Sequence, residues 1–330
     1  MTVELFPSSL PVASVLARKE SGREWLARLP ALVAELRDRW QLVLKDPYHG
    51  GSCSWVAPAR LPDGRGVVLK VAWPHREAAG EAEALRLWDG RGAVHLLRED
   101  SANSAMLLEL CEPGGTLDAA RGIPAERRLL AGAELLDTLW RTPVPPHTAL
   151  EPLAVVAGER ATLAELRMAR LRSATDGGPQ GAGLDGGGLD GAGLDGGLVA
   201  YGVRLMRELP ASAARQVVLH GDFNPGNVVA ARRRPWLAID AKPLIGDPAY
   251  DPWPLIEQVD DPFDHGSASR LLGRRLALVA DTLGEQPQRL AAWAVARRVE
   301  TALQAAARGE LPAARAILGE ARLLADHSER

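Results

Sequence analysis

The stretch from Leu219 to Asn227, Leu-His-Gly-Asp-Phe-Asn-Pro-Gly-Asn, constrains this chain more than any other feature of its sequence. It lies between two short β-prone runs, Val217–Leu219 and Asn227–Ala230. Gly, Asn and Pro favour tight turns, so an acid and an amide are expected in one loop between two strands. A further β-prone run, Trp236–Ile239, follows and ends directly before another carboxylate, Asp240.

The polar side chains of this stretch suit phosphoryl transfer. That reaction needs a carboxylate near the attacking hydroxyl and oxygen ligands for the magnesium ions that bridge the phosphates. We therefore assign Asp222 as the catalytic residue and Asn227 and Asp240 as the metal ligands. A polar turn without function uses the same residue types, but the complete loop followed at short range by Ile-Asp is more specific than an isolated His-Gly-Asp. The sequence predicts a kinase that uses a nucleoside triphosphate.

The N-terminal third predicts a sheet with one inserted helix. An amphipathic helix is expected first, at Glu24–Trp40, and a second one at Arg76–Trp88. Pro62–Arg65 is a hairpin-turn signal between two β-prone runs. The expected strands are Gln41–Leu44, Ser54–Leu61, Gly66–Trp73, Val94–Leu97 and Ala105–Leu110. A mostly antiparallel sheet fits this order better than a doubly wound array.

After Pro113-Gly114-Gly115, which predicts a turn, the chain becomes mainly helical. The expected helices are Ala125–Arg141, Leu163–Arg172, Val199–Glu208 and several from Asp251 to the end. We therefore predict an α+β protein with two parts. Residues 1–110 form an N-terminal nucleotide-binding lobe with a leading helix, and residues 111–330 form a C-terminal catalytic and substrate lobe.

The segment 175–197 repeats Leu-Asp-Gly three times and is rich in glycine. Ordering so much glycine costs more entropy than the segment can recover, which predicts a flexible surface insertion. The alternative is a calcium site on the repeated aspartates, Asp185, Asp190 and Asp195. Glycine–aspartate arrays that bind calcium use longer repeats in several stacked turns, so the insertion is favoured.

The composition excludes several classes of function. The net charge is −3, which indicates neither a nucleic-acid nor an anionic-membrane partner. Cys53 and Cys111 have no zinc-site spacing, and two cysteines make a poor disulfide framework in 330 residues. No window is long and apolar enough to cross a membrane, and the first residues lack the pattern of a signal peptide. A cytoplasmic enzyme is expected.

Four segments together resemble a known family. They are the His-Gly-Asp loop, Leu69-Lys70-Val71, the Trp88–Leu97 segment and the run Ile239–Asp251, which contains Gly-Asp-Pro-Ala-Tyr-Asp. The chain resembles the streptomycin 6-kinase and hydroxyurea phosphotransferase family of bacterial antibiotic kinases, from about Tyr48 to Asp251. The resemblance implies a two-lobed protein-kinase-like fold, ATP as phosphoryl donor, Mg2+ and an alcohol group as acceptor. The glycine-rich insertion and an ill-defined phosphate loop depart from it.

Within this resemblance, Lys70 matches the strand lysine that neutralises the α- and β-phosphates of ATP. Its partner is expected on the following helix, where Glu81 and Glu83 both qualify. We prefer Glu81 because Leu85 and Trp88 lie on the same helical face, which should point at the sheet.

The same resemblance implies two further nucleotide contacts. Gly50, Gly51 and Ser52 stand where a phosphate-covering loop belongs, although their pattern is also that of a common hairpin. Backbone groups around Glu109 and Cys111 are expected to bind the edge of the nucleobase, in the segment that joins the lobes.

The acceptor is the least constrained part of the prediction. The resemblance implies an aminoglycoside, with streptomycin expected and hydroxyurea or another small hydroxyl compound as the alternative. A nucleotide-binding pseudoenzyme and, more weakly, a hydrolase built on His220 and Asp222 are rivals from other classes. Four carboxylates are candidates for binding a cationic acceptor, although a solvated loop explains them equally well: Glu257, Asp260, Asp261 and Asp264.

Overall fold

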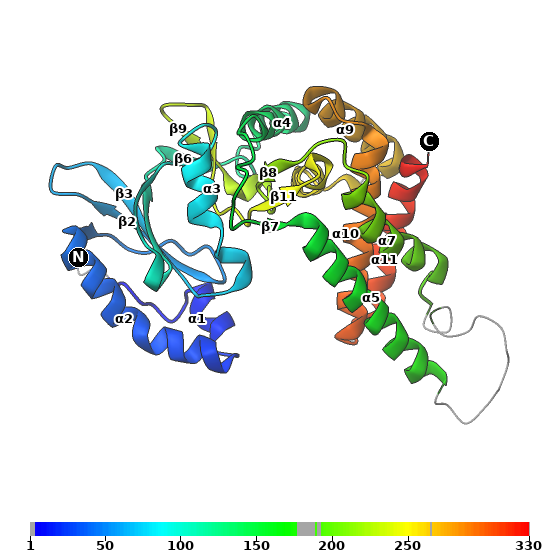
Figure 1. The fold of residues 1–330 in the computed structure, drawn as a ribbon, viewed down its shortest axis with the longest axis horizontal. Coiled ribbons are helices and arrows are strands. Elements are labelled where there is room, and N and C mark those ends of the chain that lie inside the picture. The colour runs from blue at the N-terminus through cyan, green and yellow to red at the C-terminus, as the bar shows by residue number, and fades with distance from the viewer. Residues whose placement is uncertain (1–3, 177–188, 190–192, 265, 330) are drawn as a thin grey trace. The chain divides into compact units, whose positions relative to one another are not determined.

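The computed structural model describes residues 4–176, 189, 193–264 and 266–329 (Figure 1). The chain divides into two compact units. The first unit comprises Met1–Thr116 with Val229–Lys242, and the second comprises Leu117–Val228 with Pro243–Arg330. The expected lobe boundary between residues 110 and 111 stays a prediction, and each unit is described below by itself.

The first unit contains the antiparallel sheet that the sequence predicts. Its strand order is β1-β2-β3-β5-β4. The bounds are β1 Val43–Leu44, β2 Ser54–Arg60, β3 Gly66–Ala72, β4 Leu96–Asp100 and β5 Ala105–Glu109. β2 alternates between buried and half-buried side chains, whereas β3 is buried from its second residue onwards because it lies inside the sheet. Lys70 in β3 faces Val56 of β2 and Met106 of β5 in the register.

The described part of this unit contains three α-helices. The sequence does not predict α1 (Pro11–Leu16), because prolines interrupt the N-terminal segment; Pro11 stands at the first helical position, where a missing N–H is tolerated. α2 (Glu20–Trp40) contains the expected leading helix and buries Val33 and Leu36 in the core that also holds Trp55. The expected helix 76–88 is divided into a 3-10 turn and α3 (Glu81–Trp88).

A second sheet, with strand order β10-β9-β6, corrects one expectation. The predicted turn at Pro113-Gly114-Gly115 is part of a strand, β6 (Pro113–Thr116), which pairs antiparallel with β9 (Val228–Ala231). Gly114 allows this because its φ is +80° and a Cβ there would lie 2.9 Å from the carbonyl oxygen of Cys111. β10 (Trp236–Ala238) completes the sheet.

The second unit is mainly helical around one small sheet. In that sheet β11 (Leu244–Gly246) lies between β8 (Val217–Leu219), which is antiparallel to it, and β7 (Glu151–Pro152), which is parallel. The helices are α4 Ala125–Trp140, α5 Leu153–Asp176, α7 Gly196–Ala211, α8 Trp253–Gln258, α9 Ala268–Leu283, α10 Pro287–Ala307 and α11 Leu311–Ser328. None of the helices in the described part of the chain is long and apolar enough to span a membrane.

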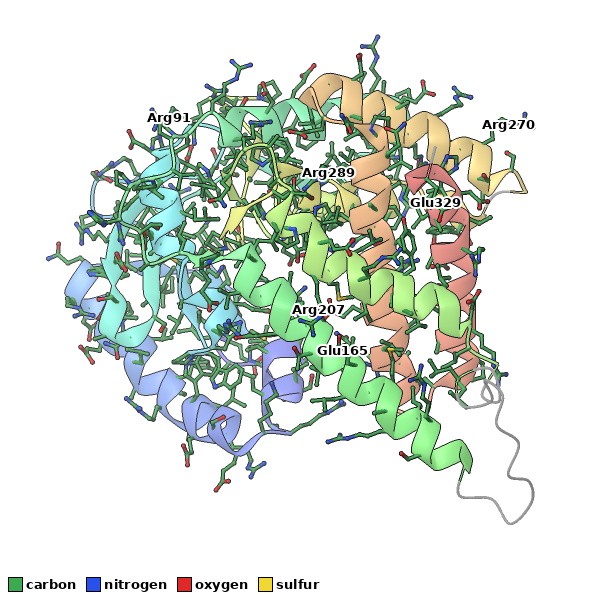
Figure 2. The ribbon with its side chains drawn as sticks, turned by 45° about the vertical axis from the view of Figure 1, so that its right-hand side comes forward. Arg91, Glu165, Arg207, Arg270, Arg289 and Glu329 are labelled. Carbon is green, nitrogen blue, oxygen red and sulfur yellow. The ribbon has the colours of Figure 1, made fainter. Side chains whose placement is uncertain are left out.

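α10 is the central helix of this bundle, and it packs against α11, α7 and α5 (Figure 1). Gly202 of α7 permits a close approach, because a Cβ there would come within 2.5 Å of Val299 of α10. Between α5 and α7, Glu165 and Arg207 point toward one another and form an ion pair of 2.7 Å (Figure 2).

Most of the predicted glycine-rich insertion, with Asp185 and Asp190, lies outside the described residues. Its C-terminal end is described, and there the contacts are specific. Leu194 is buried, and the Asp195 carboxylate caps α7 by accepting a hydrogen bond of 2.8 Å from the Leu198 amide. Asp195 also pairs with Arg322 of α11. The carboxylate of this third aspartate of the repeat is therefore already engaged within the protein.

Candidate functional site

Lys70 stands at the centre of a cluster of charges in the first unit. Its side chain is buried, and its Nζ donates to both carboxylate oxygens of Glu81, at 2.7 and 2.6 Å. It also donates to Oδ1 of Asp240 at 2.5 Å. Burial opposes the charge on Lys70, but the two carboxylates outweigh it and raise its pKa above the ordinary value. Lys70 therefore keeps its positive charge, which its predicted contact with the phosphates requires.

The partner of Lys70 is Glu81, which the helical spacing favours over Glu83. Glu81 is the first residue of α3 and is buried, as are Leu85 and Trp88 further along the same face. Glu83 is only partly buried. The position of Glu81 follows from the amphipathic pattern of α3, because its apolar residues turn this face toward the sheet. The role of the pair in nucleotide binding stays a prediction.

Asp240 combines restraint with access to solvent. Its backbone has φ = +57°, an uncommon conformation for a residue other than glycine. β10, which precedes it, is held by two backbone hydrogen bonds of Ala238, one to Gly92 and one from Val94. Nevertheless 48% of the Asp240 side chain is exposed. A carboxylate with this exposure fits a magnesium ion that takes its other ligands from phosphates and water.

In the second unit, a buried carboxylate holds the His-Gly-Asp loop in place. Asp251 accepts hydrogen bonds from the backbone amides of His220 (2.7 Å) and Gly221 (2.8 Å), and from the indole of Trp140 (3.3 Å). Gly221 has φ = +81°, which permits the sharp turn before Asp222. Asp251 is fully buried, and burial raises its pKa, although the electrostatic interaction with His220 and the hydrogen bonds from the loop amides oppose the rise.

Hydrogen bonds inside the loop then orient Asp222 and Asn227. The Asn227 side-chain amide donates to the carbonyl of Asp222 at 2.9 Å. This bond orients the amide, whose oxygen is the group that can bind a metal, since the NH2 group is only a donor. Asn224 donates to a carboxylate oxygen of Asp222 at 3.3 Å and accepts from the amide of Gly226 at 3.0 Å. The loop is a rigid turn that positions one carboxylate and one amide.

The side chain of His220, in the same loop, is shielded from solvent. It is fully buried and packs edge-on against Phe223, with ring centroids 5.3 Å apart. A buried ring cannot act on a substrate, so the hydrolase alternative built on His220 has no support in this geometry.

Asp247, the other acid of the Gly-Asp-Pro-Ala-Tyr-Asp run, is also buried and paired. Its Oδ2 accepts from the indole of Trp293 (2.6 Å) and from Nε of Arg289 (2.8 Å), and both donors lie on α10. The sequence singles out this run without assigning a role to its acids. The structure assigns Asp251 to the loop and Asp247 to the attachment of α10.

The predicted phosphate loop and hinge lie in the first unit. Gly50, Gly51 and Ser52 are exposed, and a Cβ on Gly50 would meet no atom within 4 Å. The amide of Glu109 is used inside the protein, because it donates to the carbonyl of His95. Cys111 is partly buried, and burial, with the nearby Glu109 charge, raises the pKa of its thiol to about 12. The nucleotide contacts of these five residues stay predictions.

Two of the four predicted acceptor-binding carboxylates are already engaged within the second unit. Glu257 pairs with Arg298 at 2.6 Å, and Asp260 pairs with the buried Arg128. Asp261 accepts a hydrogen bond of 2.8 Å from the amide of Phe263, which uses one of its two oxygens. A cationic acceptor would therefore have to compete for Glu257 and Asp260, which the sequence alone does not reveal.

Comparisons with known proteins identify relatives of this chain. The family model for aminoglycoside/hydroxyurea antibiotic resistance kinases matches residues 39–309. Streptomycin 6-kinase of Streptomyces glaucescens is 34% identical over 302 residues, covering 89% of each chain. Streptomycin 6-kinase of Streptomyces griseus is 35% identical, covering 86% of this chain and 85% of the relative. Hydroxyurea phosphotransferase of Kitasatospora aureofaciens is 34% identical, covering 88% of this chain and 77% of the relative.

Solved structures extend the comparison to the fold. Choline kinase LicA from Streptococcus pneumoniae is similar with a TM-score of 0.58 at 12% identity, over 91% of this chain and 99% of that one. A thermostable mutant of aminoglycoside phosphotransferase APH(4)-Ia gives 0.54 at 16% identity, over 88% and 97%. The predicted protein-kinase-like fold, with an antiparallel sheet followed by a mainly helical part, is confirmed.

Proposed function

The chain belongs to the aminoglycoside/hydroxyurea antibiotic resistance kinase family, and on this basis we propose that it transfers the γ-phosphoryl group of ATP to a hydroxyl of streptomycin. It is a phosphotransferase with an alcohol group as acceptor, and its substrate is a small molecule. Streptomycin is favoured because two streptomycin 6-kinases match most of the chain at about 34% identity.

The observation that carries the proposal is the charge cluster around Lys70. We assign Lys70 to the α- and β-phosphates, with Glu81 holding its ammonium group in place. Asp240 and the side-chain oxygen of Asn227 would hold Mg2+, which when bound neutralises charge on the phosphates. Two hard oxygen ligands suffice for this ion, because it takes its other ligands from phosphates and water.

On the second unit, Asp222 has the role of orienting the acceptor hydroxyl and accepting its proton. The restraints from Asn224 and Asn227 support this role, because a base must be held within hydrogen-bond reach of the proton that it takes. A pseudoenzyme that only binds nucleotide would not require a carboxylate held in this way.

Streptomycin recognition has a weaker physical motive. Its streptidine ring carries two guanidinium groups, which pair with carboxylates in planar, bidentate geometry. Since Glu257 and Asp260 are engaged by arginines, Asp261 and Asp264 are the better candidates among the predicted carboxylates.

Mass spectrometry after incubation with ATP and Mg2+ tests the proposal. Streptomycin should gain one phosphoryl group, whereas kanamycin should not, and Asp222→Asn serves as the inactive control. Hydroxyurea belongs in the same panel, because the hydroxyurea phosphotransferase matches at similar identity. If hydroxyurea gains the group and streptomycin does not, the substrate assignment is wrong and the kinase assignment stands. Phosphorylation of no acceptor, with ATP still bound, would favour the pseudoenzyme.

A further inference from the structure

Arg233 makes an unusually complete set of contacts for a residue in a turn. It lies between β9 and β10, and its Nε and Nη2 donate to the two carboxylate oxygens of Glu109 at 2.7 and 2.9 Å. Its Nη1 donates to the carbonyl of Gly90 and its Nη2 to the carbonyl of Ala93, both at 2.6 Å. These four hydrogen bonds occupy most of the five N–H groups of a guanidinium.

Those two carbonyls belong to the short connection between α3 and β4, which we call the 90–95 connection. At one end it follows α3, the helix that begins with Glu81. Along its length it pairs with Ala238, two residues before Asp240, through an isolated parallel bridge from Ala93. The 90–95 connection therefore adjoins both elements that supply carboxylates to Lys70.

Glu109 also bonds to the 90–95 connection, at its last residue. Its carboxylate accepts from the amide of His95 at 3.0 Å, and its own amide donates to the His95 carbonyl. Arg233 and Glu109 together thus hold the 90–95 connection at both ends, at Gly90 and at His95. All these groups lie within the first unit.

We propose that Arg233 is a positioning residue for the nucleotide site, acting with Glu109 through the 90–95 connection. The bonds to Gly90 and Ala93 fix the end of α3, and hence Glu81, relative to the strand that leads to Asp240. This inference rests on the proposed function, in which Glu81 and Asp240 serve Lys70 and the metal.

The neighbouring arginine shows that the role is specific to one position of the Arg-Arg-Arg turn. The Arg232 side chain is 82% exposed and pairs with the half-exposed Glu112, at 3.2 Å. The Arg233 side chain is 30% exposed and reaches the backbone of another segment. Lysine could not replace it, because a single ammonium group lacks the planar fork that serves Glu109 and two carbonyls at once.

The test compares Arg233→Gln, Arg233→Lys and the control Arg232→Gln. Steady-state kinetics with varied ATP, Mg2+ and acceptor should show a rise of about 10–100-fold in KM for ATP and in the Mg2+ requirement for Arg233→Gln. The KM for the acceptor should stay within about twofold, and Arg232→Gln should match the parent. Arg233→Lys should fall between the two, and Glu109→Gln should act in the same direction as Arg233→Gln.

A merely structural role gives a different result. If Arg233→Gln lowers the melting temperature but leaves the KM for ATP unchanged, or raises both KM values equally, the inference is wrong. Should Arg233→Gln fail to fold, Arg233→Lys and Glu109→Gln decide by the same criterion.

Titration with a fluorescent ADP analogue separates this inference from the proposed function, because it detects weaker nucleotide binding by Arg233→Gln even if no acceptor is phosphorylated. Unchanged affinity there would overturn it.

Discussion

The two units hold their candidate functional groups by different means. In the first unit, Lys70 is fixed by direct ion pairs to Glu81 and Asp240. In the second, Asp222 is fixed through its backbone, because Asp251 accepts hydrogen bonds from the two preceding amides. One arrangement depends on the balance of charge and the other on the conformation of a loop.

The two arrangements should respond differently to substitution. Removing one member of a buried ion pair leaves its partner as an uncompensated charge. This destabilises the protein and weakens the binding of any ligand that the remaining charges contact. Removing a buried carboxylate that orders a loop instead leaves backbone amides without their acceptor, so the loop loses its fixed conformation. Substitutions in the Lys70 cluster should therefore affect nucleotide affinity, and those of Asp222 and Asp251 should affect turnover.

Asp222→Asn should cause the greatest loss of activity. The amide cannot accept the proton of the acceptor hydroxyl, so kcat should fall by about 10²–10⁴-fold. Because the side chain keeps its size, ATP affinity by calorimetry should remain within about twofold of the parent. A folded variant with near-normal kcat would contradict the contrast between the units, since the second unit would then not carry the reactive group.

Lys70→Ala and Asp240→Ala should follow, with losses in both affinity and rate. Each removes a charge that we assign to phosphates or to Mg2+, so the affinity for ATP with Mg2+ should fall by at least about tenfold. Lys70→Ala also leaves Glu81 buried without its cation, so its melting temperature should drop more than that of Asp240→Ala, whose side chain is half-exposed. Unchanged ATP affinity in both variants would refute the assignment of the cluster.

Asp251→Asn should have a smaller effect on rate and should leave ATP affinity unchanged. An amide offers one acceptor oxygen in place of the two that His220 and Gly221 use, so the loop should loosen and kcat should fall by about 10–100-fold. Asp247→Asn is the matched control, because Asp247 is equally buried but bonds to α10. The control should lose stability with kcat nearly intact, and equal kcat losses in the two variants would contradict the special role of Asp251.

The sequence predicted the central elements of both units well. Short β-prone runs predicted the strands of the five-stranded sheet, and the face of α3 identified Glu81 as the partner of Lys70. Some short strands were not predicted, for physical reasons. β11 follows Pro243 and ends with Gly246, and β6 begins with Pro-Gly-Gly; both patterns are turn signals when the partner strand is unknown.

The residues that position the site were harder to predict than those that perform the chemistry. Asp251 is separated from His220 by some thirty residues, and only the fold brings them together. Arg233 is one of three consecutive arginines, and no local pattern distinguishes it from Arg232. Both bind backbone groups of distant segments, which every residue has, and their side-chain partners, Trp140 and Glu109, are more than 100 residues away, so side-chain spacing carries no signal for them.

The least disruptive test concerns Cys111 and asks whether burial controls charge in the first unit. With its pKa at about 12, the Cys111 thiol should be ionised in about one molecule in ten thousand at pH 8, four pH units below that value. An ordinary cysteine, with a pKa of about 8.5, is roughly one-quarter ionised at that pH. Since the thiolate is the nucleophile, alkylation of Cys111 by iodoacetamide should be about 10³-fold slower than that of a free cysteine. The rate should rise about tenfold per pH unit up to pH 10.

The measurement uses the variant Cys53→Ala, which leaves Cys111 as the one thiol, and follows its alkylation by mass spectrometry. Glu109→Gln in this background should speed the reaction, because the negative charge of Glu109 helps to keep the thiol protonated. Alkylation at the rate of a free cysteine at pH 8 would show that water reaches this segment and that burial does not set its charges.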